Sequence, residues 1–586
     1  MHRRWFINRT NPEYIEYLSK AASVSPALAQ ILINRGIKTL EEIDSFLNPR
    51  VSQLSDPFDM QGMKMSVDRI LSAADSGERI LVHGDYDADG LSATAIALKA
   101  LKKLGIDCHP FIPNRIEHGY GFTPASYRKA REIGASLIIT VDCGITSFEA
   151  TALSKKEGID VIITDHHEPM RDQRPEGQSN HKSQIRDHNF LLPDALAIIN
   201  PKVSDRHSPV FNLSGAGIAL KLAQALCTVR NPGITVHDFI DLAALGTMAD
   251  VVPLTDENRI IVKEGLQLLD KGVRPGIRAL KQVAGIDNKA TKTGLLLFTL
   301  IPRINAAGRI SDAGPVLDLL LTESEDHAIE ISLWLDKLNS ERQRIEEEVY
   351  RQALSMVSDK GVSPIIVLSG SGWNRGVIGI VASRITEKFY RPTFILSVED
   401  GIARGSARSI PSFDIYRALG DCKDLLKGFG GHKQAAGLEL DSLNISTFEE
   451  SINRIAGKVL AGKDFVPSLE IDVNVDLADI GFDLLREFEM LEPFGFGNPE
   501  PSLGSKGLEV LYPKIVKDKH LKMKLRHKTL SLDAIGFNMA AFFEKLGDWN
   551  TVDAVYSPSV NEWEGRRSIQ LNLKALRQGL ESWNCI

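Results

Sequence analysis

Beyond residue 78 the chain alternates short apolar runs with longer segments whose apolar residues recur every three or four positions. The runs predict buried strands and the longer segments predict helices. Strands that alternate with helices in this way predict a parallel sheet with helices on both faces, and ligands bind such a sheet beyond the carboxyl ends of its strands. The predicted strands are RILVHG (79–84), LIITVD (137–142) and VIITDHH (161–167), with helices at 90–105 and 147–158 between them.

The remaining patterns predict an α/β protein of several domains. Residues 323–358 contain no Gly or Pro and carry apolar residues at helical spacing, so they predict a helix of about 50 Å at 1.5 Å per residue. Short alternating strands near the end of the chain predict a β-barrel. The predicted parts are an N-terminal helical cap on the next domain (1–75), the parallel-sheet domain (76–260), a helical connector (261–360), a second α/β domain (361–460) and the barrel (461–586).

The composition is typical of a soluble protein in a reducing compartment. The chain has 586 residues, too many for one hydrophobic core, with 43% hydrophobic and 25% charged residues. Its five cysteines lack CxxC spacing, which indicates reduced thiols. The first residues have no apolar signal-peptide core, and the longest apolar stretch, 294–301, is too short to cross a membrane. We therefore expect a cytoplasmic protein without a membrane partner.

Acidic and histidine residues gather where the predicted strands end. Such oxygen and imidazole ligands, without thiolate, favour two Mn²⁺ or Mg²⁺ ions over structural zinc. Because adjacent strand residues point in opposite directions, at most one residue of the His166–His167 pair is expected to bind a given metal. Asp250, which follows a predicted helix, is about equally a ligand or an ordinary helix-end acid. The strand-end residues are His83, Asp85, Asp87, Asp89, Asp142, Asp165, His166 and His167.

Two adjacent divalent cations form a clamp for in-line phosphoryl chemistry. The sequence has no Walker-type glycine loop, so ATP is not implied. The net charge of −7 would ordinarily argue against a nucleic-acid partner. Bound cations offset the acidic cluster, however, and local charge matters more than the sum.

Four motifs resemble, in order, motifs I to IV of the DHH phosphoesterase superfamily: HGDYDADG, TVDCGI, TDHHEP and GTMADVVPL. The resemblance implies that Asp142 bridges two metals and that Asp165 orients a histidine ligand. It also implies that His167 lies near the scissile phosphate. It gives Asp85 no role as a metal ligand, and we expect this side chain just behind the ligands. The implied ligands are His83, Asp87 and Asp142 for one metal and Asp89, Asp142, His166 and Asp250 for the other. The expected catalytic residues are Asp87, Asp89, Asp142, His166, His167 and Asp250.

Three further segments are together similar to the RecJ family of bacterial single-strand-specific 5′→3′ DNA exonucleases, and the resemblance covers nearly the whole chain. They are PRINAAGR (302–309), WNRGVIGIVASRI (373–385) and LEPFGFGNPEP (491–501). A fourth segment, GFGGHKQAAG (428–437), looks like the signature of a DHHA1 domain. Its paired glycines allow close approach to a phosphate, although a tight turn explains them equally well.

The RecJ resemblance also implies contacts to a terminal phosphate, which arginine binds through two hydrogen bonds. The implied residues are Arg115, Arg309, Ser406, Arg408 and His432. Two features depart from the family: Asn374 stands where histidine is expected, and the loop at 171–190 is longer than usual. The composition of that loop predicts a mobile surface loop, with a binding role for its arginines as the alternative.

A basic strand in the predicted barrel suits a single-stranded polyanion. In LKMKLR (521–526) the apolar residues face one way, while Lys522, Lys524 and Arg526 face the other. From Lys514 to Lys528 there are seven Lys or Arg residues and one acid. One cationic strand face is what an OB-fold groove needs to follow a nucleic-acid backbone, and a merely solvated face is the alternative.

The sequence thus predicts a monomeric DNA recombination and repair nuclease that releases 5′-mononucleotides from single-stranded DNA. The family resemblance implies helicase and single-strand-binding protein as partners. One alternative is a DHH phosphodiesterase of short oligonucleotides or cyclic dinucleotides, against which the barrel argues. The other is a non-catalytic replication scaffold on the same fold, against which the intact ligand set argues.

Overall fold

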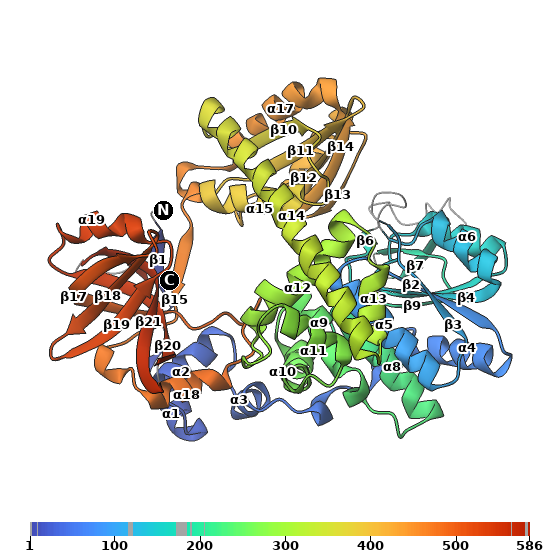
Figure 1. The fold of residues 1–586 in the computed structure, drawn as a ribbon, viewed down its shortest axis with the longest axis horizontal. Coiled ribbons are helices and arrows are strands. Elements are labelled where there is room, and N and C mark those ends of the chain that lie inside the picture. Colours follow the sequence, from blue (N-terminus) through green and yellow to red (C-terminus); the bar gives the residue numbers. More distant parts are fainter. Residues whose placement is uncertain are drawn as a thin grey trace.

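The computed structural model describes residues 3–8, 10–114, 121–171, 184–187, 190–203, 206–563, 565–579 and 584–585. These residues form three sheet-containing units. Figure 1 shows the C-terminal barrel at the left, the parallel-sheet domain at the right and the second α/β domain above them. The predicted fold class is therefore confirmed.

The parallel-sheet domain has helices on both faces, as predicted. Alternate residues of its strands point to opposite sides: Val82 packs with α4, α5 and α8, while Leu81 packs with α6 and α7. The strands, in sheet order, are β3 (Cys108–Phe111), β2 (Arg79–Gly84), β4 (Ala135–Val141), β5 (Asp160–Thr164) and β9 (Ala197–Ile199). The helices are α4 (Met63–Asp75), α5 (Ala88–Lys103), α6 (Pro124–Ile133), α7 (Phe148–Lys156) and α8 (Gly215–Arg230).

The long polar segment after β5 contains strands where a surface loop was predicted. The described parts form a small antiparallel sheet of β6 (Met170–Arg171), β8 (Phe190–Pro193) and β7 (Gln184–Asp187). Sheet pairing, rather than the composition of the segment, sets these short strands. Residues 172–183 and 188–189 lie outside the described residues.

A set of helices joins the parallel-sheet domain to the rest of the chain. The longest, α14 (Glu325–Lys360), has 36 residues, and its two halves contribute to different cores. Across the described chain, every helix is too short or too polar to span a bilayer. The helices before α14 are α9 (Ile240–Ala249), α10 (Asp256–Lys271), α11 (Pro275–Val283), α12 (Thr293–Ile310) and α13 (Gly314–Leu321).

The second α/β domain has a mixed sheet in the order β10-β11-β12-β14-β13. Only β10 and β11 are parallel, and α15 connects them. Helices α14 and α15 cover one face, while α16 and α17 cover the other. The elements are β10 (Ile366–Ser371), α15 (Ile378–Phe389), β11 (Thr393–Glu399), β12 (Ile402–Arg408), α16 (Ile415–Gly420), β13 (Gly428–His432), β14 (Ala435–Asp441) and α17 (Ile445–Val459).

The C-terminal unit is a closed five-stranded barrel, because its first strand also pairs with its fourth. The apolar residues of the basic strand, Leu521, Met523 and Leu525, are buried inside it, as the alternation predicts. The strands are β17 (Leu503–Val516), β18 (His520–His527), β19 (Leu530–Gly536), β20 (Val552–Trp563) and β21 (Arg566–Gln578), with α18 (Phe482–Met490), β16 (Val473–Asn474) and α19 (Phe543–Leu546) beside them.

The N-terminal segment packs mainly with this barrel, so the predicted cap on the parallel-sheet domain is wrong for most of its length. Strand β1 (Arg4–Ile7) pairs with β15 (Ser468–Ile471) and β22 (Asn584–Cys585). Helices α1 (Pro12–Ala22), α2 (Pro26–Asn34) and α3 (Leu40–Leu47) share the apolar core of the barrel. Helix α4 and the residues just before it, from Val51 to Met60, pack instead with the core of the parallel-sheet domain. Short amphipathic helices carry an apolar face in their sequence but no record of the surface that covers it.

Candidate active site

The acidic and histidine side chains that follow separate strands meet at the carboxyl edge of the parallel sheet. Three groups have ligand atoms within 4.8 Å of one another. Asp142 belongs to two of the groups and His166 to two, so the groups form one continuous centre. The groups are Asp142, His166 and His167; Asp89, His166 and Asp250; and Asp85, Asp87 and Asp142.

Two of the carboxylates are fixed by helix N-termini. Asp87 caps α5, where its Oδ1 accepts hydrogen bonds of 3.0 Å from the backbone N–H groups of Asp89 and Gly90. Asp89 accepts from the backbone N–H of Gly215 at 2.7 Å and of Ala216 at 2.9 Å, in the first turn of α8. Helix N-termini attract negative charge and hold these side chains in one rotamer. The α8 contact was not predicted, since nothing near Asp89 in the sequence points to it.

Asp142 lies at the centre of the cluster in an unusual backbone conformation. Its φ is +62°, in the left-handed region that Asp and Asn tolerate better than most residues. A Cβ at Gly215 would lie 2.3 Å from its Oδ1, so glycine is needed there for the close approach of α8. Burial and the carboxylates of Asp89 and Asp87 hold the pKa of Asp142 well above its usual range. A cation would relieve this repulsion.

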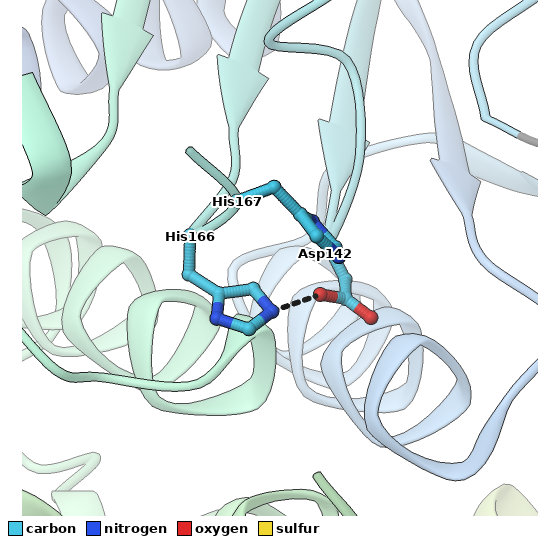
Figure 2. A group of neighbouring side chains, drawn as sticks. All are labelled: Asp142, His166 and His167. Carbon is cyan, nitrogen blue, oxygen red and sulfur yellow. Dashed lines mark ion pairs between the residues drawn. The ribbon is translucent and has the colours of Figure 1, made fainter. Parts of the chain in front are cut away.

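The two histidines lie side by side but have different partners. Nε2 of His166 is 3.2 Å from Oδ1 of Asp142 (Figure 2) and 3.5 Å from Oδ2 of Asp250. Burial and the charge of His167 lower the pKa of His166 to about 4, so its ring is neutral. Asp165 lies 2.8 Å from Nδ1 of His167 and, against the effect of burial, raises the pKa of that ring to about 9. Asp165 therefore orients His167 rather than His166.

His83 is fully buried at the end of β2, beside the cluster. Its Nδ1 lies 3.1 Å from Oγ of Ser126 on α6, which the sequence did not single out. Its Nε2 has no hydrogen-bond partner among the described residues. Oδ1 of Asp142 has no hydrogen bond there either, and its near neighbour is the ring nitrogen of His166 at 3.2 Å. Burial lowers the pKa of His83 to about 3, so the ring is neutral and can offer a lone pair.

These observations show that the residues fit divalent cations. Unpartnered buried polar atoms are costly in a protein, and both are of a kind that coordinates metal. The neighbouring set is rich in carboxylate oxygen, as Mg²⁺ and Mn²⁺ prefer. Asp85 is also buried, and its Oδ1 accepts a 2.8 Å hydrogen bond from the backbone N–H of Tyr86.

Helix α12 connects the acidic loop to the second α/β domain. Oδ1 of Asn305 accepts a 2.8 Å hydrogen bond from the backbone N–H of Ala88 at the start of α5. A Cβ at Gly308 would lie 2.4 Å from the carbonyl oxygen of Tyr86. Arg309 follows directly, and its Nη1 donates to the carbonyl oxygen of Gly376 at 3.1 Å. The small residues of PRINAAGR were the one sequence signal for this close packing.

Three of the predicted phosphate contacts lie at one end of the second sheet. These contacts are Ser406, Arg408 and His432. Ala435 of β14 pairs with Arg408 on one side and with His432 on the other, so Arg408 and His432 lie in one row across three adjacent strands. Nη1 of Arg408 lies 3.2 Å from Oγ of Ser406. Arg309 reaches the same domain through the turn after Trp373, in which Oδ1 of Asn374 accepts from the backbone N–H of Gly376 at 2.8 Å. The other predicted contact, Arg115, lies outside the described residues.

The basic residues of β18 lie on the outside of the barrel, opposite the buried apolar ones. Two of them have acidic neighbours on adjacent strands: Nε of Arg526 lies 2.9 Å from Glu509, and Nζ of Lys524 lies 3.9 Å from Asp533. Lys522 pairs in register with Lys514, and like charges directly opposite each other favour a bound anion.

A buried arginine attaches the barrel unit next to Asp250. Arg259, 1% exposed, donates to the carbonyl oxygens of Phe46, Met490, Leu491 and Glu492 at 2.6–3.1 Å. The backbone N–H of Leu254 donates to the carbonyl oxygen of Phe496 at 2.8 Å. The segment 491–498 is therefore packed against the residues that directly follow Asp250. Sequence patterns did not predict this contact.

Comparison with known proteins agrees with this organisation. Three family models match: "DHH family, N-terminal domain" over residues 79–247, "DHHA1 domain" over 349–458 and "RecJ OB domain" over 471–575. The chain is 38% identical to the single-stranded-DNA-specific exonuclease RecJ of Bacillus subtilis, over 97% of this chain and 70% of that protein. It is 33% identical to RecJ of Escherichia coli, over 94% and 95% of the two chains.

Solved structures show the same relationship. The crystal structure of RecJ from Thermus thermophilus in complex with Mn²⁺ is similar with a TM-score of 0.83 and 30% identity, over 99% of this chain and 80% of that one. The Mg²⁺ complex of that protein is similar with a TM-score of 0.77 and 29% identity, over 98% and 79%. The chain therefore belongs to the RecJ family of single-stranded-DNA-specific exonucleases.

Proposed function

We propose that this protein is a metal-dependent exodeoxyribonuclease that degrades single-stranded DNA in the 5′→3′ direction and releases 5′-mononucleotides. The observation that carries the proposal is the meeting of carboxylates and neutral imidazoles at one edge of the parallel sheet, among them the buried Nε2 of His83, which has no hydrogen-bond partner among the described residues. The family membership supports the substrate class.

The metal ligands divide into two sets that share Asp142. By family resemblance, His83, Asp87 and Asp142 would hold one cation, and Asp89, Asp142, His166 and Asp250 would hold the other. When bound, two such cations activate a water molecule and neutralise charge on the phosphoryl oxygens. Asp85 and Asp165 position the loops that carry these ligands, as their hydrogen bonds to backbone N–H groups indicate.

His167 is positioned to act on the substrate rather than on a metal. Asp165 occupies its Nδ1 and keeps the ring protonated, since the pKa of His167 is raised to about 9. Its Nε2–H then donates to a non-bridging oxygen of the scissile phosphate. This hydrogen bond stabilises the negative charge that develops as the bond breaks.

The second α/β domain determines where the strand begins. Arg309, Ser406, Arg408 and His432 bind the 5′-terminal phosphate, with Arg115 as a further contact by family resemblance. Because Arg309 follows the residues that pack on the acidic loop, the terminal phosphate lies a fixed distance from the metal centre. A fixed distance of this kind explains release of one nucleotide at a time.

The barrel holds the rest of the strand, with Lys522, Lys524 and Arg526 contacting backbone phosphates. By family resemblance the protein acts as a monomer in the cytoplasm, in DNA recombination and repair, beside a helicase and single-strand-binding protein. The attached barrel argues against a dinucleotide as the main substrate, because a dinucleotide needs no groove.

One degradation assay tests the proposed function. Single strands labelled at the 5′ or the 3′ end are digested with Mn²⁺, with Mg²⁺ or in EDTA, and the products are sized. The 5′ label should appear at once as mononucleotide, while the 3′ label remains on strands that shorten gradually. Blunt duplex DNA and the Asp89→Asn variant should give no product. Internal cuts, or mononucleotide released first from the 3′ label, would show that the proposal is wrong.

A further inference from the structure

Lys202 lies at the edge of the metal centre, just beyond the last strand of the parallel sheet. It follows Asn200, whose side chain is 2% exposed and links two backbones. Nδ2 of Asn200 donates to the carbonyl oxygen of His167 at 3.0 Å, and its Oδ1 accepts from the backbone N–H of Lys202 at 2.8 Å. One buried amide therefore fixes Lys202 relative to the histidine pair.

Among the described residues, an aromatic ring and a side-chain amide, rather than a carboxylate, hold the ammonium group of Lys202. Its Nζ lies 4.1 Å from the centroid of the Phe211 ring and 3.5 Å from Oδ1 of Asn212. Among the described residues, no carboxylate is within ion-pair distance of this Nζ. The interior Lys221 of the same domain, by contrast, pairs with Glu257 at 2.8 Å. An ammonium group has three donors, so Lys202 retains donors for an anionic ligand.

The charge of Lys202 acts on the metal centre. Together with burial and the charge of His167, it lowers the pKa of His166 to about 4. Burial and the charge of Arg206 lower the pKa of Lys202 below its usual value, while the carboxylates of Glu168 and Asp250 favour its charged form. The lysine is thus a preorganised cation next to a site that handles phosphodiesters.

The order of elements along the sheet edge indicates which phosphate of the strand Lys202 can contact. Helix α12, with Arg309 at its end, packs on the acidic loop after β2. Asp142 and the histidine pair follow β4 and β5, and Lys202 follows β9, which pairs with β5 on the far side from β4. Neighbouring strands lie about 4.8 Å apart. Along this edge the order is terminal-phosphate contact, metal centre, Lys202.

We propose that Lys202 binds the phosphate on the 3′ side of the scissile one, the second internucleotide phosphate counted from the 5′ end. This inference rests on the proposed function and names a substrate contact within it. Because this phosphate does not react, its contact stabilises the ground state and the transition state equally. Loss of Lys202 should therefore raise KM and leave kcat nearly unchanged.

The test is a double-mutant cycle that combines a substitution of Lys202 with removal of the charge of one phosphate in the strand. 5′-Phosphorylated tetranucleotides carry a neutral methylphosphonate at the second or at the third internucleotide position, or none. The enzymes are wild type, Lys202→Met, Lys202→Arg and, as a matched control, Lys64→Met, which changes an exposed lysine of α4 in the same domain. The measurement is kcat/KM for each pair.

For wild type and Lys64→Met, methylphosphonate at the second position should lower kcat/KM about tenfold, as expected for one charged hydrogen bond. Lys202→Met should lose about tenfold on the unmodified strand and nothing further from that methylphosphonate. The third position should affect all enzymes alike, and Lys202→Arg should restore most of the second-position effect. Because each methylphosphonate effect is a ratio within one enzyme preparation, a loss of folded protein cancels from it.

Two results would overturn the inference. One is a full tenfold methylphosphonate effect at the second position in Lys202→Met, and the other is coupling at the third position instead. Failure of the proposed function looks different, because wild type would then not degrade the unmodified tetranucleotide from its 5′ end.

Discussion

Replacing Asp142 by Asn should stabilise the metal-free protein while weakening its response to metal. The side chain is buried among carboxylates, which raise its pKa, so in the absence of cations its charge opposes folding. Asn has the same shape, carries no charge and tolerates the φ of +62°. The substitution therefore removes repulsion without disturbing the backbone. Ala would remove the same charge but is strained in that conformation.

The size of the effect follows from the distances in the centre. Ligand atoms of Asp85, Asp87 and Asp142 lie within 4.8 Å of one another, where two full charges repel by about 3.5 kcal/mol at an effective dielectric constant of about 20. Partial protonation reduces this value, so we expect a gain of about 2 kcal/mol. For a domain of this size that corresponds to a rise in Tm of about 4–8 °C. Asp142→Ala should gain about 1–2 kcal/mol less, because of its left-handed backbone.

The assay is thermal unfolding of wild type, Asp142→Asn and Asp142→Ala, in EDTA and with excess Mn²⁺. Mn²⁺ at a hundred times its Kd should stabilise wild type by about 2.7 kcal/mol per site, and Asp142→Asn by much less. A raised carboxyl pKa means that the folded state binds more protons than the unfolded chain. Metal-free wild type should therefore lose stability as the pH rises above the ordinary carboxyl range, more than Asp142→Asn does. An Asn variant less stable than wild type in EDTA would refute the reasoning.

Three further outcomes are expected. Arg408→Ala should erase a preference for 5′-phosphorylated over 5′-hydroxyl strands, at a cost of about 1.5–3 kcal/mol in kcat/KM; an unchanged preference would remove this residue from the terminal site. Replacing Lys522, Lys524 and Arg526 by Ala should flatten the salt dependence of single-strand binding by up to about 2 log units per log[salt], and equally for all base sequences. An unaltered slope would mean that this face of β18 is merely solvated. Arg259→Met should split thermal unfolding into two transitions, because it removes the buried contacts between α10 and the barrel unit; a single sharp transition would contradict that role.

The gathering of acidic and histidine side chains at one edge of the sheet could be predicted, because most of them come at the ends of parallel strands. His83 is near the end of β2, while Asp142 and His166 follow β4 and β5, and parallel strands bring their carboxyl ends to one edge. Alternation of residues also predicted the buried face of β18. Each of these predictions needed only a local period and one general rule of sheet architecture.

The supporting contacts could not be predicted, because they join positions far apart in the sequence. Ser126, which lies beside His83, and Asn305, which accepts from the backbone of Ala88, look ordinary in their own segments. The contact of α8 with Asp89 is made by backbone N–H groups, which leave no mark in the sequence. The left-handed backbone of Asp142 likewise depends on how β4 turns beneath α8. Such details decide which substitution is mild, as Asn and Ala at position 142 illustrate.

The packing of the N-terminal segment with the barrel affects how the barrel is held relative to the metal centre. Strand β1 lies between β15 and β22, so both ends of the chain meet beside the barrel (Figure 1). Arg259 and the Leu254–Phe496 hydrogen bond fix this unit against the residues that follow Asp250. The barrel is therefore held by packed contacts on the catalytic domain as well as by its connection to α17. Its distance from the metal centre is then constant, so a strand too short to reach it should be cleaved without its help, and only longer strands should respond to changes on β18.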